Sequence, residues 1–191
     1  MKSCCFTGHR PADLELLRDE EGEDCRLMKE ALYALIRGLA LERGVRHFIS
    51  GMALGLDQIA AEAVLRLKAE LQVTLEAALP FEGQGLSWSS EHEGRHRRIL
   101  KSCDSVVAMQ EGYSIGCYHR RNRYMVEKAD VLLAVWSGKT SGGSYQTLNY
   151  ARKKGKPIVI LRVPELRVEF ENMGVQTSLL QEGAQNAENP D

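Results

Sequence analysis

The chain has 191 residues, 43% of them hydrophobic, which is enough to bury the core of one ordinary domain. Its formal net charge of −1 produces no general attraction to nucleic acid or to acidic membranes, so we expect neither as a partner. The five cysteines form no CxxC pair, and no stretch is apolar and long enough for a signal peptide or a membrane span, so we expect a cytoplasmic protein with reduced thiols.

Short apolar segments alternate with helical patterns along most of the chain. We expect strands at residues 2–7, 46–50, 72–79, 104–109, 130–136 and 157–163. We expect helices at residues 22–43, 56–67, 92–102, 118–129 and 144–154, with a loop at about 81–93. This order predicts an α/β fold, a single-domain, Rossmann-like, mostly parallel sheet with helices on both faces. The domain would span residues 1–175, and residues 176–191 would form a polar, disordered tail.

Two patterns typical of phosphate loops overlap in WSGKTSGGSYQT, residues 136–147. Gly138-Lys139-Thr140 resembles the end of a P-loop, but a P-loop would need a glycine where Leu133 stands inside a predicted strand. The better candidate is the segment that follows, Ser141, Gly142, Gly143 and Ser144. It joins a strand to a helix, and paired glycines let an anion approach the free amides of the first helical turn. A tight turn with Ser144 as helix N-cap explains the same pattern, and both interpretations stay open at this point.

Two more glycine loops follow predicted strands. In SGMALGLD, residues 50–57, Gly51 suits a close approach of ligand and backbone, and Asp57 would stabilise a helix N-terminus through the helix dipole. In TGHRP, residues 7–11, His9 and Arg10 offer hydrogen bonds to phosphate or carboxylate. Because ligands of open α/β sheets bind at the carboxyl ends of the strands, the loops predict one site at this edge. None of them matches GxGxxG, so we expect no NAD(P) cofactor.

Two further motifs favour ordinary structural explanations. The stretch from His92 to His96 formally satisfies the zinc motif HExxH, but Gly94 weakens the helix and no clear third ligand follows, so we expect no metal site. The basic run His119-Arg120-Arg121-Asn122-Arg123 is typical of a solvated helix face, and we expect at most one or two of its side chains to reach the edge of the sheet.

Four segments, taken in their order along the chain, resemble the YpsA-like family of the SLOG superfamily. They are TGHRP at 7–11, Pro80-Phe81 with Gln84 and Trp88, RNRYMV at 121–126, and Gly142-Gly143 with Thr147 and Tyr150-Ala151. SGMALGLD is also similar to the SGxAxGxD signature of DprA, and the LOG-type phosphoribohydrolases are further relatives. The resemblance covers about residues 1–163 and implies a Rossmann-like sheet with a nucleotide-type ligand at its C-terminal edge. By analogy with related sheets that pair through helices flanking the site, it also suggests a homodimer.

One departure from the relatives bears on chemistry. LOG-type enzymes carry the pattern GGxGTxxE, and when it is aligned on Gly142-Gly143 the glutamate position falls on Asn149. Tyr145 and Gln146 stand where that pattern has glycine and threonine. Asparagine cannot ionise, so it cannot act as a general base, although it can still donate a hydrogen bond to a ribose hydroxyl. The loop therefore keeps residues that hold a ligand and lacks the usual reacting one.

The leading hypothesis is a protein that binds a nucleotide or nucleotide-derived ligand, as a sensor or regulatory module. The residues expected at the ligand are Gly8, His9, Arg10, Ser50, Gly51, Asp57, Trp88, Arg121, Asn122, Ser141, Gly142, Gly143, Ser144, Thr147 and Asn149. Trp88 would stack on a base or simply pack its own loop.

Two alternatives belong to other functional classes. A nucleoside-phosphate N-glycosidase would need a carboxylate near the ribose, from Asp57 or from Glu91, Glu93 or Glu111. A DprA-like binder of single-stranded DNA would use the basic residues around Arg95, but the near-neutral charge argues against it.

Overall fold

The computed structural model describes residues 1–173, so the tail predicted at 176–191 lies outside the described residues. The seven strands are β1 (Lys2–Thr7), β2 (Val45–Ser50), β3 (Thr74–Leu79), β4 (Ser105–Ala108), β5 (Val131–Trp136), β6 (Ile158–Arg162) and β7 (Val168–Glu171). The helices are a short 3-10 turn (Glu15–Leu17), α1 (Glu23–Arg43), α2 (Leu56–Leu67), α3 (Ser90–Ser102), α4 (Cys117–Lys128) and α5 (Gly142–Lys153). The strands form one sheet in the order β4-β3-β2-β1-β5-β6-β7, in which only β7 runs antiparallel to its neighbour.

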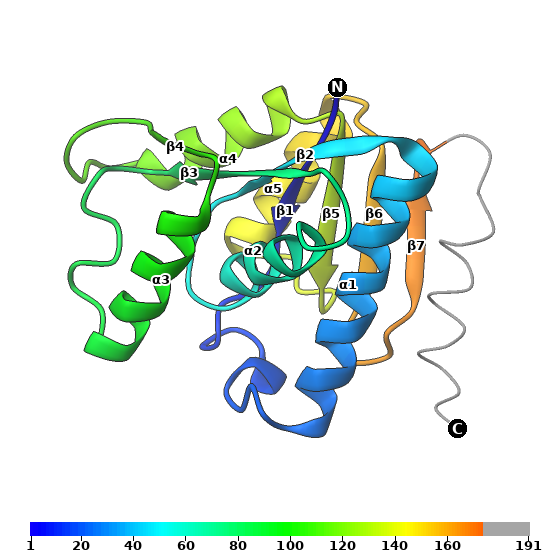
Figure 1. Ribbon diagram of the computed structural model, residues 1–191, viewed down its shortest axis with the longest axis horizontal. Coiled ribbons are helices and arrows are strands. Elements are labelled where there is room, and N and C mark those ends of the chain that lie inside the picture. Colours follow the sequence, from blue (N-terminus) through cyan, green and yellow to red (C-terminus); the bar gives the residue numbers. More distant parts are fainter. Residues whose placement is uncertain (174–191) are drawn as a thin grey trace.

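Helices cover both faces of this sheet, with α1 and α2 in front and α4 and α5 behind in the view of Figure 1. Successive side chains of each strand point to opposite faces of the sheet. Phe6 and Leu133 therefore pack with α1 and α2, whereas Cys5 and Leu132 pack with α4 and α5. Because both faces are covered, β5 is buried along its whole length. The predicted Rossmann-like α/β fold is thereby confirmed.

The centre of the sheet is where its winding direction changes. The chain proceeds from β1 outward through β2, β3 and β4 on one side, and then returns to place β5 and β6 on the other side of β1. The loops after β1 and β5 therefore lead to helices on opposite faces and leave a crevice beyond the carboxyl ends of these strands. Open α/β sheets bind their ligands at such a position.

The predicted strands and helices all have counterparts, and the differences lie at the ends of elements and in one additional strand, β7. The strand at residues 157–163 is not the last one, since β7 pairs with it at the edge through the alternating sequence VEFE. The Val168 and Phe170 side chains of β7 pack against the core, and Glu171 pairs with Arg152. The helix predicted from Ser144 begins two residues earlier, at Gly142. Within residues 1–173, no helix is both long and apolar enough to cross a bilayer.

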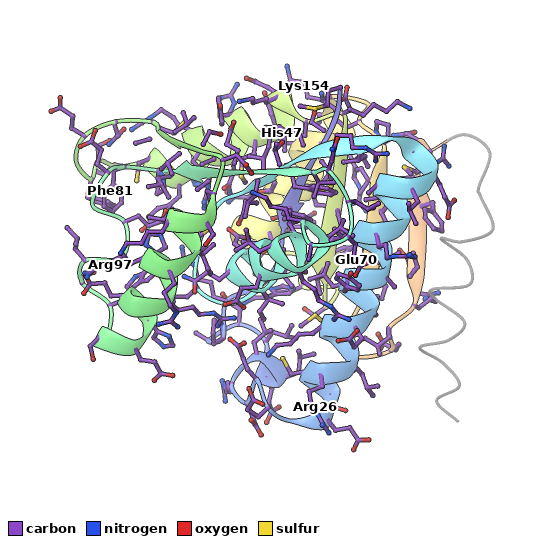
Figure 2. The ribbon with its side chains drawn as sticks, in the orientation of Figure 1. Arg26, His47, Glu70, Phe81, Arg97 and Lys154 are labelled. Atoms are coloured by element: carbon purple, nitrogen blue, oxygen red, sulfur yellow. The ribbon has the colours of Figure 1, made fainter. Side chains whose placement is uncertain are left out.

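A buried carboxylate joins α4 to the sheet. Glu76 on β3 is 3% exposed and accepts hydrogen bonds from Tyr124 Oη at 2.9 Å and Lys128 Nζ at 2.6 Å. His47 on β2, labelled in Figure 2, places Nε2 at 3.4 Å from the same carboxylate. Burial alone would raise the pKa of Glu76, but the bonds from His47, Lys128 and Tyr124 outweigh burial and lower the pKa to about 2.

This network predicts a pH-dependent loss of stability on substitution of Glu76. Because the folded-state pKa is depressed, the stabilisation is fully present above the unfolded-state value and disappears as the pH falls from about 4.5 to about 2. We expect Glu76→Gln to lower the free energy of unfolding by roughly 3 kcal/mol at pH 7, from 1.36 kcal/mol per pKa unit. Urea denaturation at several pH values measures this difference, and an equal loss at pH 7 and at pH 2.5 would contradict the assignment.

Candidate functional site

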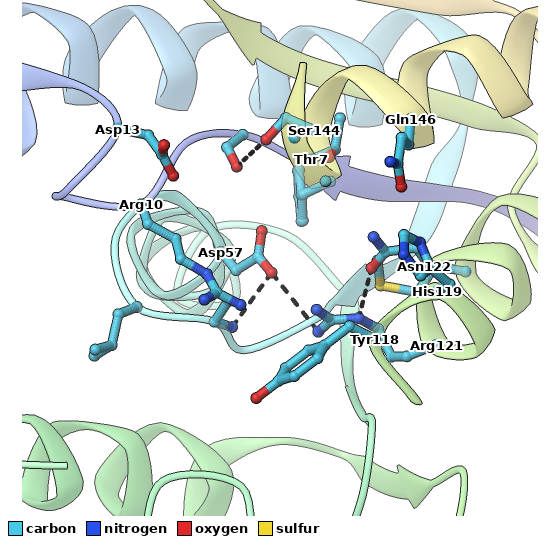
Figure 3. Close-up of a pocket in the computed structure, with 17 residues that line it drawn as sticks. Thr7, Arg10, Asp13, Asp57, Tyr118, His119, Arg121, Asn122, Ser144 and Gln146 are labelled. Carbon is cyan, nitrogen blue, oxygen red and sulfur yellow. Dashed lines mark hydrogen bonds and ion pairs between the residues drawn. The ribbon is translucent and has the colours of Figure 1, made fainter. Parts of the chain in front are cut away.

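A cavity of about 430 Å³ opens where β1, β2 and β5 end (Figure 3). The loops after β1 and β2 supply Gly8, Arg10, Asp13, Ala53 and Leu54, and the first turn of α2 supplies Asp57. The helices α4 and α5 supply Tyr118, His119, Arg121, Asn122, Met125, Gly142, Gly143, Ser144 and Gln146. Segments far apart in the sequence thus meet at the crevice that the sheet topology creates.

The N-terminus of α5 forms one wall of the cavity. Its N-cap residue Ser141 has an extended backbone and makes no side-chain cap hydrogen bond. The first amides of a helix have no carbonyl partner within the helix, so here they can receive an external acceptor. A β-carbon added at Gly142 or Gly143 would meet no atom within 4 Å. Gly142 has a φ of +87°, a conformation that itself favours glycine, whereas at Gly143 the open space alone distinguishes the position.

Ser144 is not the N-cap that the tight-turn interpretation assigned to it. It is the third residue of α5, and its hydroxyl donates a hydrogen bond of 2.5 Å to the carbonyl oxygen of Gly8. This bond ties the start of α5 to the loop after β1, as Figure 3 shows. The two walls of the cavity are consequently held at a fixed separation.

The other predicted loop glycines serve packing. A β-carbon at Gly8 would overlap the side chain of Leu56, and one at Gly51 would overlap the guanidinium of Arg121 and lie 2.7 Å from Asp57 Oδ2. Only glycine fits at these positions because other parts of the protein already fill the space. Close approach to a ligand, which the sequence suggested for Gly51, is thus replaced by close approach to Arg121.

A buried ion pair lies beneath the cavity. Arg121 Nη1 lies 3.8 Å from Asp57 Oδ2 and donates hydrogen bonds to the carbonyl oxygens of Gly51 and, at 3.4 Å, Ala78. Burial raises the pKa of Asp57, an effect that Arg121 opposes, and burial lowers the pKa of Arg121. Arg121 Nε also donates to Asn122 Oδ1 at 2.8 Å. One guanidinium therefore connects α4 with the ends of β2 and β3.

His9 and Ser50 are buried and engaged in internal bonds. His9 Nε2 accepts a hydrogen bond of 3.1 Å from the amide of Ser137, and burial lowers the pKa of its imidazole. Ser50 Oγ donates at 2.6 Å to the backbone carbonyl of Asp57 and accepts from the amide of Met52. Neither side chain lines the cavity; both fix the loops that do.

Three more predicted site residues lie away from the cavity wall. Trp88 packs edge-on against His96, with the ring centroids 5.1 Å apart. Thr147 donates at 2.8 Å to the carbonyl of Gly143 and lines a separate hollow of about 140 Å³ between α4 and α5. Asn149 Oδ1 accepts from Arg152 Nη1 at 3.4 Å.

The sequence interpretation missed Tyr118, His119, Asp13 and Gln146, all of which line the cavity. The basic run contributes more than the one or two side chains expected, because His119, Arg121 and Asn122 all reach the wall. Positions 118, 121, 122 and 125 share one face of α4, so helical spacing was the available signal. Arg10 lies over the ring of Tyr118, 5.3 Å from its centroid.

The two rejected motifs have structural explanations. Lys139 of the GKT tripeptide is exposed and forms an ion pair with Asp13 at 2.8 Å, which links the loops after β5 and β1. In the HExxH motif, His96 is buried and His92 is exposed. Among residues 1–173, no three His, Cys, Asp or Glu side chains gather as they would around a metal ion.

Comparison with known proteins decides the family. The model of the YspA SLOG family, YpsA, matches residues 4–166. The chain belongs to this family. It is 30% identical over 139 residues to the uncharacterised SPbeta prophage-derived protein YoqJ of Bacillus subtilis strain 168, a match that covers 66% of this chain and 81% of YoqJ.

Other relatives agree with this placement. A UPF0398 protein of Bacillus cereus strain B4264 is 28% identical over 160 residues, which is 82% of this chain and 85% of the relative. The X-ray structure of TM1055 superimposes with a TM-score of 0.53 at 18% identity, over 86% of this chain and 76% of that one, and supports the fold. Membership of the SLOG family suggests a nucleotide-related ligand without fixing which one.

The contrast between the glycines generates a prediction about stability. Gly51→Ala should lower the free energy of unfolding by about 2–4 kcal/mol, because the new methyl group would displace Arg121 from its buried partners. Gly143→Ala, at a position with open space and no positive φ, should change the stability by less than about 0.5 kcal/mol. Thermal unfolding followed by circular dichroism compares the two variants. Equal melting temperatures would contradict the distinction between a closely packed Gly51 and an open Gly143.

Proposed function

We propose that the protein binds a nucleotide or nucleotide-derived ligand, with a phosphate held by the amides at the start of α5. The observation that carries the proposal is the open glycine pair Gly142-Gly143, which lies within a cavity at the switch point of the sheet. The positive end of the helix dipole favours an anion at this position. A volume of about 430 Å³ also falls within the usual range for small-molecule sites.

The charges around the cavity favour the same placement of the ligand's phosphate. Arg10 is exposed, lines the cavity, and carries a guanidinium suited to phosphate. The buried carboxylate of Asp57 enters from the other side of the cavity in Figure 3, opposite Ser144. Because like charges repel, a phosphate is favoured at the start of α5 and disfavoured beside Asp57, whose carboxylate already attracts Arg10.

Hydrolysis of an N-glycosidic bond would place different demands on the site. The residue aligned with the reacting glutamate of LOG-type enzymes, Asn149, bonds to Arg152 and lies outside the cavity wall. A hydrolase would instead have to use Asp57 or Asp13, the two carboxylates of that wall. Binding without reaction needs only the groups already described, so we favour it.

The surface does not favour binding of single-stranded DNA. Arg95 is bound to Glu20 and Glu62, with N–O distances of 2.6 Å to each. Arg97, labelled on α3 in Figure 2, pairs with Glu93. Because affinity for DNA depends on basic groups that neutralise phosphates, arginines already paired with glutamates contribute little.

The proposal is tested by calorimetric titration of the folded protein with AMP, ADP, NAD and ADP-ribose. At least one should bind with a Kd below about 1 mM. Gly143→Val should weaken that binding at least tenfold, because the side chain would fill the space in front of the amides, while the melting temperature stays near that of the wild type.

Gly112→Val is the matched control, since Gly112 also has open space around it and lies outside the cavity wall. It should leave nucleotide affinity unchanged. If folded wild-type protein binds none of these ligands, the proposal is wrong. Retained affinity in Gly143→Val, together with a lowered melting temperature, would make the loop a purely architectural turn.

A further inference from the structure

The two carboxylate oxygens of Asp57 have different surroundings. Oδ2 accepts a hydrogen bond of 3.3 Å from the amide of Ala53 and lies 3.8 Å from Arg121 Nη1. In Figure 3 both dashed lines at this carboxylate end on the same oxygen, and the other oxygen points into the cavity. Within residues 1–173, no donor forms a hydrogen bond to Oδ1. One oxygen atom of this buried carboxyl group is therefore presented to whatever occupies the cavity.

The position of this acceptor is fixed. Ser50 Oγ holds the backbone carbonyl of Asp57 at 2.6 Å, and Arg121 is itself anchored on the carbonyls of Gly51 and Ala78. Asp57 is 7% exposed, so its side chain cannot turn away into solvent when a ligand enters. An acceptor held rigidly in one position discriminates between a ligand group that donates a hydrogen bond and one that does not.

The chemistry of a carboxylate selects the part of the ligand that can lie beside it. An ionised carboxylate only accepts hydrogen bonds, so it repels phosphate oxygens and binds hydroxyl or amino hydrogens. With the phosphate on the α5 wall, the sugar is the next group of a nucleotide along its covalent chain. Its hydroxyls are hydrogen-bond donors, and Asp57 is a carboxylate of the same cavity.

We propose that Asp57 Oδ1 accepts a hydrogen bond from a hydroxyl of the ligand's ribose, and that the site thereby selects ribonucleotides over deoxyribonucleotides. The inference rests on the nucleotide-binding function proposed above and names its ligand class more narrowly. Loss of a ligand hydroxyl would leave a buried charged acceptor without a partner, which is costlier than loss of a bond to a neutral group.

The test compares AMP, 2′-deoxy-AMP and 3′-deoxy-AMP by calorimetry on the wild-type protein and on two variants. Wild-type protein should bind at least one deoxy analogue roughly tenfold more weakly than AMP. In Asp57→Asn the charge is gone, so the ratio should fall below about threefold. Asp104→Asn is the matched control, because Asp104 is also an aspartate paired with a lysine, Lys68, at 2.8 Å but lies outside the cavity wall, and it should keep the wild-type ratio.

Each result bears on a different claim. Equal affinity of wild-type protein for AMP and both deoxy analogues would overturn the ribose assignment while leaving nucleotide binding intact. An unchanged ratio in folded Asp57→Asn would assign the hydroxyl to another residue and also overturn it. Failure of AMP, ADP, NAD and ADP-ribose all to bind would contradict the proposed function itself. Since the wild-type ratio alone can refute the inference, the test does not depend on the variant's folding.

Discussion

The ion pair between Arg121 and Asp57 fixes the arrangement of the elements around the cavity, at the carboxyl ends of the strands. Arg121 is almost completely buried and contacts the carboxylate of Asp57 and the carbonyls of Gly51 and Ala78. A charged group so far from water is tolerated only when paired and hydrogen-bonded, so α4 must stay against the ends of β2 and β3. The glycine at position 51 follows from this requirement, because any β-carbon there would occupy the place of the guanidinium.

The remaining parts of the cavity depend on this fixed wall. Ser144 links α5 to the loop after β1, and His9 links that loop to Ser137 after β5. With these bonds made inside the protein, the polar groups that face the cavity include the start of α5, Arg10 and one oxygen of Asp57. In the proposed complex, the amides of α5 would hold a phosphate and the Asp57 carboxylate would accept a hydrogen bond from the sugar.

The sequence was sufficient for the fold and for part of the site. Apolar strands alternating with amphipathic helices, such as 130–136 followed by 144–154, predicted the parallel sheet because both of its faces are buried. The glycine loops predicted the edge at which the cavity lies. The buried position of the Arg121 side chain could not be predicted from the sequence, because it depends on contacts at the ends of β2 and β3, more than 40 residues away in the chain. Of the two roles that the sequence left open for Trp88, packing is the one the structure shows, against His96.

The central claim is that the first amides of α5 hold the ligand's phosphate, and a ¹H–¹⁵N spectrum recorded during titration with AMP tests it most directly. The account predicts that the largest saturable shifts occur at Gly142, Gly143 and Ser144, whose amides lie in the first turn of α5. Inorganic phosphate at higher concentration should move the same signals in the same direction. Saturable binding of AMP that leaves all three signals in place would contradict the account.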